Sequence, residues 1–489
     1  MEMQFEETIW EPTSPSSQYL NSSTLSLSII CVLETKVPIE IEDSRVFTLL
    51  KDVYLPINPR FSSIMVTEKD GERKWKRVEV NIEDHVKTLE FPGGQPLSFY
   101  DEYFSNYLSK LASDPFIENR PMWELHLLKF QTSKAAGNVI FRLHHSLGDG
   151  YSLMGALLSC LQRADNPSLP LTFPSRKRSG ANSEFQDDRY TILNTSIQDR
   201  AVNIVKRVPR ALMTMVSTLQ DFGRSVLKST LIEDDRTPIR SGHDGVEFQP
   251  IEIVTTTFSL DSIKQIKDKL NVTLNDVITG VVIYGTRLYM QGVNKETSNG
   301  KCTALVLFNT RAIGGYKSVS DMVKPNSEMP WGNHFTFLPV PLPQLTSNDS
   351  MDPLGFVVKA RSIIKRQRNS ASVFLTSRLL EILRKVEGPE ATAKYIHATL
   401  KHTSMGITNL IGPLEEMSLA NHPIKGLYFV VAGAPQSLSV TMVSYVDKLR
   451  VAIVVEKDFI DPNKLKSCIE YSFETIFNAA IKSSSIVKI

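Results

Sequence analysis

One stretch of the chain, residues 141–150, constrains the fold more than any other. It reads Phe-Arg-Leu-His-His-Ser-Leu-Gly-Asp-Gly. An apolar run over 139–143 leads into it and an apolar periodic run over 153–161 follows, which predicts a strand, a tight turn and a helix. If the strand continues to the histidines, alternation puts His144 and His145 on opposite faces. Only one of the two imidazoles can then face a given cavity.

The polar residues of this stretch have a structural interpretation and a catalytic one. A buried His beside a turn is more often a core residue than a catalyst, while Gly150 would serve the turn and Asp149 would cap the helix. The combination of these residues at this spacing favours the catalytic interpretation. Two His, an Asp four residues after the second, and then a Gly arise by chance in roughly one chain of this size in a thousand.

The residue types fit acyl transfer. A neutral imidazole at His145 can take a proton from a hydroxyl that attacks an acyl carbon, and can pass it to a departing thiolate. The chain has no G-x-S-x-G elbow and no Cys near the turn, so direct transfer in a ternary complex is favoured over an acyl-enzyme. Asp149 would either orient the imidazole or hold the loop by pairing with an Arg.

The stretch resembles the HHxxxDG signature of the CoA-dependent acyltransferase superfamily, which includes chloramphenicol acetyltransferases, plant BAHD acyltransferases and peptide-synthetase condensation domains. Upstream, residues 114–124 resemble the P-L-x-x-x-R-P-x-W segment of the wax ester synthase/diacylglycerol acyltransferase family, with Phe116 in place of its Leu. Residues 275–276, 309–311 and 408–413 lie where that family has later motifs. The resemblance covers nearly the whole chain and is that of a plant-type member.

The resemblance implies an α/β fold of two chloramphenicol-acetyltransferase-like domains with an active-site tunnel between them. His145 would lie near the middle of the tunnel as general base, within a catalytic motif that also holds His144, Asp149 and Gly150. A fatty acyl group would pass from acyl-CoA to a long-chain alcohol, giving wax ester, or to diacylglycerol, giving triacylglycerol. Acyl-CoA would be a co-substrate, with no bound cofactor and no metal.

Two further sites have alternative interpretations. The amide of Asn275, at a helix N-terminus, would donate to a developing oxyanion, an interaction worth roughly 3 kcal/mol in comparable sites. Against this, Thr273 and Asp276 form a capping-box pattern that needs no catalytic role. Superfamily resemblance makes Arg311 the candidate partner of Asp149, at about even odds with a surface Arg that closes a strand.

The length of 489 residues suggests two or three domains. We predict an N-terminal acyltransferase domain over 1–173, a linker and basic amphipathic crossover helix over 174–245, and a C-terminal acyltransferase-like domain over 246–489. The helix carries an apolar stripe between residues 205 and 226 with basic residues beside it. It would lie in a membrane interface or pack on the protein, and we weigh the two equally.

Composition restricts the remaining classes. The net charge of +2 argues against nucleic-acid binding. Four scattered cysteines in or beside apolar segments predict reduced core residues in a cytosol-facing protein and no metal site. No signal peptide is visible. The sequence contains no run of 18 consecutive apolar residues, so it predicts no transmembrane helix. The family resemblance implies the endoplasmic reticulum membrane, with the plasma membrane as an alternative, and leaves peripheral and single-pass attachment open.

Two other functions stay open. A BAHD-like enzyme acting on phenolic or amine acceptors would keep the same histidine, although the triplet at 221–223 lacks the flanks of the BAHD DFGWG motif. A non-catalytic protein that binds lipid or acyl-CoA would keep the scaffold without turnover.

The remaining pattern predicts a helix over 99–111, strands at 123–128, 251–258, 302–308, 334–342, 426–432, 437–445 and 449–455, and a last helix capped by Asp461.

Overall fold

The computed structural model describes residues 10–40, 43–67, 73–91, 93–172, 232–309, 331–346, 349, 352–369 and 372–485. The predicted amphipathic helix between 205 and 226 and the candidate Arg311 lie outside these residues. The amphipathic helix and the Asp149–Arg311 pair therefore stay predictions.

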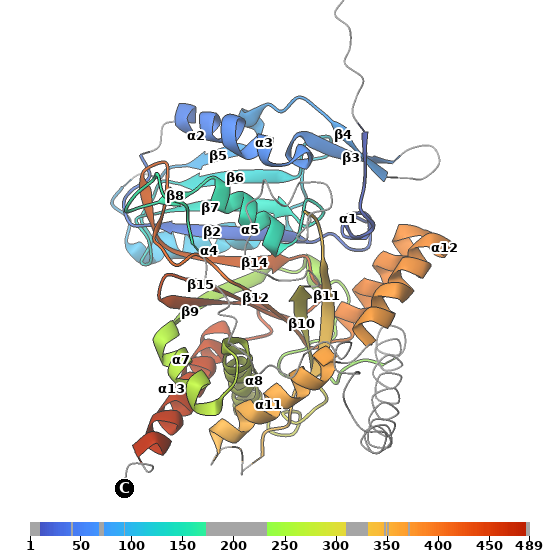
Figure 1. The fold of residues 1–489 in the computed structure, drawn as a ribbon, viewed down its shortest axis with the longest axis vertical. Coiled ribbons are helices and arrows are strands. Elements are labelled where there is room, and N and C mark those ends of the chain that lie inside the picture. Colours follow the sequence, from blue (N-terminus) through green and yellow to red (C-terminus); the bar gives the residue numbers. More distant parts are fainter. Residues whose placement is uncertain are drawn as a thin grey trace, which may run out of the picture.

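The first large sheet has seven strands and contains the central histidine stretch (Figure 1). Its central strands are buried along their whole length, since apolar clusters cover both faces. Along β7, Val139 and Phe141 pack in one cluster and Ile140 in the other, as strand alternation requires. The strand order is β5 (Val86–Leu89), β6 (Trp123–Leu128), β7 (Gly137–His144), β2 (Ser28–Thr35), β14 (His422–Ala432), β13 (Met417–Leu419) and β8 (Gln162–Arg163).

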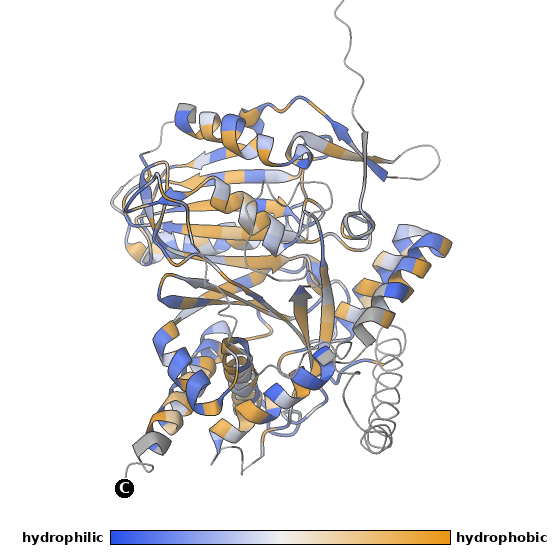
Figure 2. Cartoon of the chain, viewed as in Figure 1, coloured by the Kyte–Doolittle hydropathy of each residue, from blue (hydrophilic) through white to orange (hydrophobic). Residues whose placement is uncertain are grey.

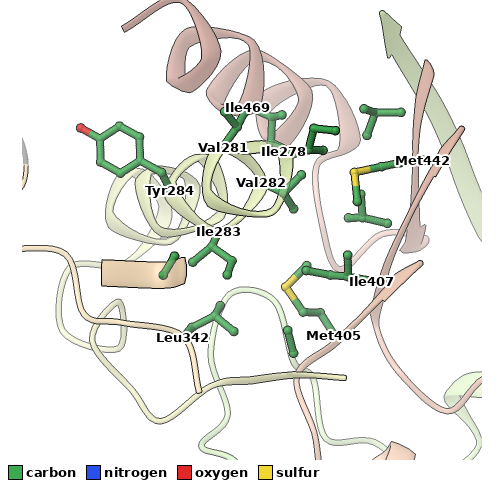
Figure 3. Packing of buried hydrophobic residues seen from close by; sticks show 14 of the residues in the cluster. Ile278, Val281, Val282, Ile283, Tyr284, Leu342, Met405, Ile407, Met442 and Ile469 are labelled. Carbon is green, nitrogen blue, oxygen red and sulfur yellow. The ribbon is translucent and has the colours of Figure 1, made fainter. Parts of the chain in front are cut away.

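The second large sheet has six strands, and helices cover the face that points away from the first sheet (Figure 1). The covering helices are α7 (Leu260–Leu270), α8 (Leu274–Val293), α11 (Pro353–Asn369) and α13 (Pro462–Ser485). Figure 3 shows side chains of α8 packed against Met405, Ile407 and Met442 of the sheet. The strand order is β11 (Phe335–Pro341), β10 (Thr303–Asn309), β12 (Met405–Leu410), β15 (Leu438–Tyr445), β16 (Lys448–Glu456) and β9 (Ile251–Ser259).

Smaller elements surround the first sheet. A three-stranded sheet has the order β1 (Trp10–Pro12), β4 (Arg73–Arg77) and β3 (Ser63–Thr67). The helices in this half are α1 (Pro15–Tyr19), α2 (Asp43–Leu49), α3 (Leu55–Ile57), α4 (Leu97–Ser113) and α5 (Gly150–Ser159), with a π-helix at Leu50–Tyr54 and 3-10 turns at Pro59–Ser62 and Ile82–Asp84.

The two large sheets share one contact layer, formed by β14 from the first and β15 and β16 from the second (Figure 1). Its buried residues come from both sheets and include Tyr428, Val430, Ala452 and Val454. Because β13 and β14 belong to the last quarter of the chain, the first sheet is built from both ends of the sequence. The domain boundaries predicted at 173 and 246 stay predictions, and strands of the first sheet come from both sides of them.

Local sequence signals predicted most of these elements. The helix over 99–111 is α4, the strand over 123–128 is β6, and α8 begins with the predicted capping box between Thr273 and Asp276. The Asp461 carboxylate accepts hydrogen bonds from the first turn of α13, as expected of a cap. These predictions are confirmed, and each depends on residues that are close together in sequence.

Helix α12 (Ser372–Lys401) was not predicted, and it contains a break. Gly388 has φ 88° and ψ 178°, and Pro389 follows it. Pro cannot donate an i to i−4 hydrogen bond, and only Gly adopts this backbone readily, so the helix is two segments joined at Gly388. Figure 2 shows polar and apolar residues alternating along α12, while the sheets are largely apolar. In the described part of the chain, no helix is long and apolar enough to cross a bilayer.

Candidate active site

The central stretch folds as the predicted strand, turn and helix. Strand β7 ends at His144, α5 begins at Gly150, and the backbone N–H of His145 donates to the carbonyl of Leu27 at 2.8 Å. The two imidazoles face opposite sides, as alternation predicted. The ring of His144 lies 5.7 Å from the ring of Phe116, and the ring of His145 lies 5.3 Å from the ring of Phe335.

His145 is buried and held by the side chain of one residue at two points. The Nδ1 atom of His145 lies 3.0 Å from Oδ1 of Asn333, and Nδ2 of Asn333 donates to the carbonyl of His145 at 2.8 Å. Burial lowers the pKa of His145, and the Asp149 carboxylate opposes part of this shift. The ring is therefore neutral near pH 7, as a general base must be.

His144 contacts protein groups through both ring nitrogens. Its Nδ1 accepts from the backbone N–H of Ser146 at 3.2 Å, so the neutral ring carries its proton on Nε2, which donates to the hydroxyl of Ser26 at 3.0 Å. Burial lowers the pKa of His144 to about 3. These contacts give His144 a role in fixing the turn, and its predicted place in the chemistry stays a prediction.

Asp149 caps α5 and also binds a distant segment. One carboxylate oxygen accepts from the backbone N–H of Ser152 at 3.0 Å, and the other accepts from the backbone N–H of His334 at 2.9 Å. The hydroxyl of Ser152 exchanges hydrogen bonds with the backbone of Gly332. Asp149 thus ties the start of α5 to residues 331–334, as a loop-holding residue would.

Gly150 follows directly and lies in a tight space. A Cβ atom there would stand 3.1 Å from Cδ1 of Leu410, on β12 of the second sheet. The glycine of the motif therefore lets the start of α5 approach the second sheet closely.

A cavity of about 360 Å³ lies next to this segment, between β10 and β11, α1 and the helices α11 and α12. Asn333 and Phe335 form part of its wall. Within the described chain, His145 contacts that wall and does not itself line the cavity, which differs from the expected place in mid-tunnel. Asn333 and Phe335 both contact His145 and line the cavity. Other lining residues, mostly apolar or small, include Ser16, Tyr19, Leu305, Phe337, Pro339, Leu380 and Ile396.

The structure does not bring Asn275 and Asp276 into contact with the histidines among the described residues. Nδ2 of Asn409 donates to Oδ1 of Asn275 at 3.2 Å, and Asp276 caps α8 with Thr273. Asn409 shares its strand face with Ile407, which packs against α8, whereas Leu410 on the other face lies against Gly150. The capping role of Asp276 is confirmed, and the oxyanion role of Asn275 stays a prediction.

Sequence reasoning missed Asn333, although it makes the closest side-chain contact to His145. The two residues are 188 positions apart, and the 331–334 segment carries no periodic pattern that joins it to β7. Trp331 donates from its indole N–H to the carbonyl of Leu147 at 2.9 Å and thereby fastens the same segment to the turn. No cluster of three or more His, Cys, Asp or Glu suited to a metal occurs among the residues described here.

Comparison with protein families gives two matches that together cover most of the chain. The description "Wax ester synthase/diacylglycerol acyltransferase catalytic domain" matches residues 34–278, and "WS/DGAT C-terminal domain" matches residues 331–477. Two similar curated proteins are wax ester synthase/diacylglycerol acyltransferases 4 and 5 of Arabidopsis thaliana. Each is 30% identical to this chain, and the matches cover 97% and 95% of this chain and 91% and 93% of the relatives.

Solved structures share the fold at low identity. A wax ester synthase/diacylglycerol acyltransferase from Marinobacter aquaeolei VT8 aligns with a TM-score of 0.56 and 15% identity, over 96% of this chain and 100% of that one. The condensation domain of the monacolin K polyketide synthase MokA aligns with a TM-score of 0.52 and 11% identity, over 97% and 98% of the two chains. The predicted α/β, two-domain acyltransferase fold is confirmed.

Proposed function

This chain belongs to the wax ester synthase/diacylglycerol acyltransferase family and is an acyltransferase, and from that premise we propose its substrates and its base. It moves a fatty acyl group from acyl-CoA to a long-chain alcohol or to diacylglycerol, with His145 as general base. The observation that carries the proposal is the state of His145. Its ring lies against the wall of a largely apolar cavity, its Nδ1 is engaged by Asn333, and burial lowers its pKa.

The chemistry needs only one proton carrier. Nε2 of His145 removes the proton of the acceptor hydroxyl as its oxygen attacks the thioester carbon of acyl-CoA. The C–S bond breaks, the new C–O ester bond remains, and the protonated imidazole returns its proton to the CoA thiolate. Burial helps because a site that excludes water prevents hydrolysis of the thioester.

Phe335 controls access in this scheme. Its ring lines the cavity, its centre lies 5.3 Å from the centre of the His145 ring, and it packs edge-on against Phe337 with 5.6 Å between ring centres. We expect the ring to turn aside when a lipid chain fills the cavity. Replacement by the larger Trp should hold the passage closed, with kcat/KM for hexadecanol lowered at least about tenfold, since small misplacements at reacting groups cost this much or more. Steady-state kinetics measures it. A Phe335→Trp enzyme with the wild-type kcat/KM would contradict the role.

The substrate proposal is tested with purified protein and radiolabelled palmitoyl-CoA. Hexadecanol, diacylglycerol and small phenolic or amine acceptors are offered in competition, and products are separated by chromatography. Wax ester or triacylglycerol is the expected product. Label found mainly in a phenolic ester or an amide would show a BAHD-like enzyme, and tight acyl-CoA binding without product would show a non-catalytic protein.

We propose further that the protein works at an anionic membrane surface on the cytosolic side of the endoplasmic reticulum. Support comes from the outer face of α12, where Leu375, Ile382 and Val386 are 38%, 52% and 76% exposed at helical spacing. Two cations, Arg378 and Lys385, lie beside them, and each pairs with Glu381. Leu380 and Arg384, on the inner face of the same helix, line the cavity, so lipid would pass from the bilayer around one helix.

Charge on this outer face should abolish membrane binding. Ile382→Glu combined with Val386→Glu is expected to lower the fraction of protein that co-sediments with phosphatidylserine-containing vesicles about tenfold, because the apolar stripe then carries carboxylates. The matched control, Val293→Glu with Ile481→Glu, charges two other exposed apolar residues, 48% and 43% exposed, near the ends of α8 and α13. Equal binding by both double variants would refute α12 as the docking face. A fluorescent fusion that co-localises with a plasma-membrane marker would correct the compartment.

A further inference from the structure

We infer that Asn333 is a positioning residue for His145, which fixes the ring orientation and leaves Nε2 as the basic atom. This inference deepens the proposed function and rests on His145 being the base. It assigns a role in the reaction to a residue outside the histidine stretch, supplied by the segment that precedes β11.

The two contacts of Asn333 determine its own orientation. The backbone carbonyl of His145 can only accept, so the side-chain group of Asn333 that faces it at 2.8 Å must be the NH₂ group. The amide oxygen then faces Nδ1 of His145 at 3.0 Å, and an oxygen can only accept from that nitrogen. Nδ1 must therefore carry the proton of the neutral ring. The lone pair of the imidazole is left on Nε2.

Asn333 is itself held rigidly by the residues of the histidine stretch. Its neighbour His334 donates its backbone N–H to Asp149, and its neighbour Gly332 bonds to the hydroxyl of Ser152. On the other side, the hydroxyl of Ser16 donates to the carbonyl of Asn333 at 3.2 Å. Asp149 is thus linked to the imidazole of His145 through the backbone of His334 and the side chain of the adjacent Asn333. This gives the Asp of the motif a mechanical link to its His.

The opposite proton placement at His144 shows how specific this is. There a backbone N–H donates to Nδ1, which puts the proton on Nε2. The two adjacent histidines therefore hold opposite tautomers. Among the described side chains, Asn333 is the one that accepts from Nδ1 of His145. Among the described residues, the titratable groups that act on His145 are His144 and Asp149, while Arg60 and His334 lie near Gly332.

Two substitutions test the role through different readouts. Asn333→Ala removes the side-chain acceptor of Nδ1 and leaves the ring only its contact with the backbone of His145, so kcat should fall about 10- to 100-fold while KM for acyl-CoA changes less than threefold. Asn333→Asp keeps an acceptor at Nδ1 but adds a negative charge, which favours the protonated ring. Its pH profile of kcat should have the acid limb moved upward by about one to two pH units. If Asn333 were purely structural, its replacement would not shift the acid limb of the pH profile, and it would not lower kcat while leaving KM unchanged.

Controls separate this inference from the proposed function. Asn138→Ala, at the start of the same strand β7, removes an Asn that is more deeply buried than Asn333, and it should leave both readouts unchanged. The double variant His145→Ala with Asn333→Ala should be no slower than His145→Ala alone, since Asn333 acts through the ring. Full activity in His145→Ala would overturn the proposed function. An inactive His145→Ala beside an Asn333→Asp enzyme with an unmoved acid limb would overturn only the role of Asn333. Circular dichroism and thermal unfolding confirm that each variant is folded.

Discussion

Replacing His145 by Ala is expected to lower kcat about 10²- to 10⁴-fold, the usual contribution of a general base. The fold should survive. His145 hydrogen-bonds through its ring to Asn333 alone among the described side chains, and β7 keeps its backbone pairing with β2. Product formation from labelled acyl-CoA and thermal unfolding together measure the effect.

His144→Ala provides the comparison for this variant. It removes a ring that bridges Ser26 and Ser146, so it should lower the melting temperature more than His145→Ala does.

The pH dependence of wild-type activity has a defined direction. Since burial lowers the pKa of His145, wild-type activity should persist below pH 6.5 and fall only when the ring protonates. Activity of His145→Ala within threefold of wild type would refute the assignment of the base.

The second large effect concerns stability and lies on the opposite face of β7. Arg142→Ala should lower the free energy of unfolding by about 3–5 kcal/mol, because it strands a buried carboxylate without its partner. Nη1 of Arg142 donates to Glu124 at 2.9 Å, and both side chains are less than one-tenth exposed. The guanidinium also lies 4.1 Å from the centre of the Phe116 ring and donates to the carbonyl of Asp114.

The same pair makes stability depend on pH. Although burial raises the pKa of Glu124, hydrogen bonds and charge from His126 and Arg142 outweigh it and hold the pKa at about 2. A lowered carboxylate pKa gives stability that is present above pH 4.5 and is lost as the pH falls toward 2. Burial also lowers the pKa of His126, so the unfolded ring takes up protons below pH 6.5 before the folded ring does. Both groups destabilise the fold in acid.

Urea unfolding at pH 7, pH 5 and pH 3 measures this prediction, because Glu124 loses its contribution below pH 4.5. Wild type should lose stability between pH 5 and pH 3, and Arg142→Ala should lose less, since Glu124 has then lost its buried cationic partner and keeps, among the described residues, only His126 and the half-exposed Lys87. Arg142→Met combined with Glu124→Leu should recover most of the loss at pH 7, because apolar residues replace a buried ion pair at little cost. An Arg142→Ala protein as stable as wild type at pH 7 would show that the pair contributes nothing.

Sequence patterns predicted what is local. The turn after β7, the opposite faces of His144 and His145, the cap at Asp149 and the capping box of α8 all depend on neighbouring residues. Their physics is complete within a few positions, so composition and spacing suffice.

Long-range contacts were not predictable in the same way. Asn333 meets His145 only because Asp149, Ser152 and Trp331 fasten two distant segments together. The alternation of β6 does not reveal the partners of His126, whose Nδ1 lies 2.8 Å from the hydroxyl of Tyr107 and whose Nε2 lies 3.3 Å from Glu124. The break in α12 left no continuous periodic run to detect. Each depends on tertiary packing that a single sequence does not encode visibly.

The position of β14 has a consequence for synthesis in the cell. Strand β2 pairs with β14, and Ser28 lies opposite Ala432 in the register. These partners are about 400 residues apart in sequence, so they leave the ribosome roughly 20 to 80 seconds apart. Until β14 emerges, β2 is an apolar edge strand with unpaired backbone groups. Nascent chains should therefore depend on chaperones through most of translation, and a truncation before residue 422 should yield aggregates in place of a folded N-terminal half.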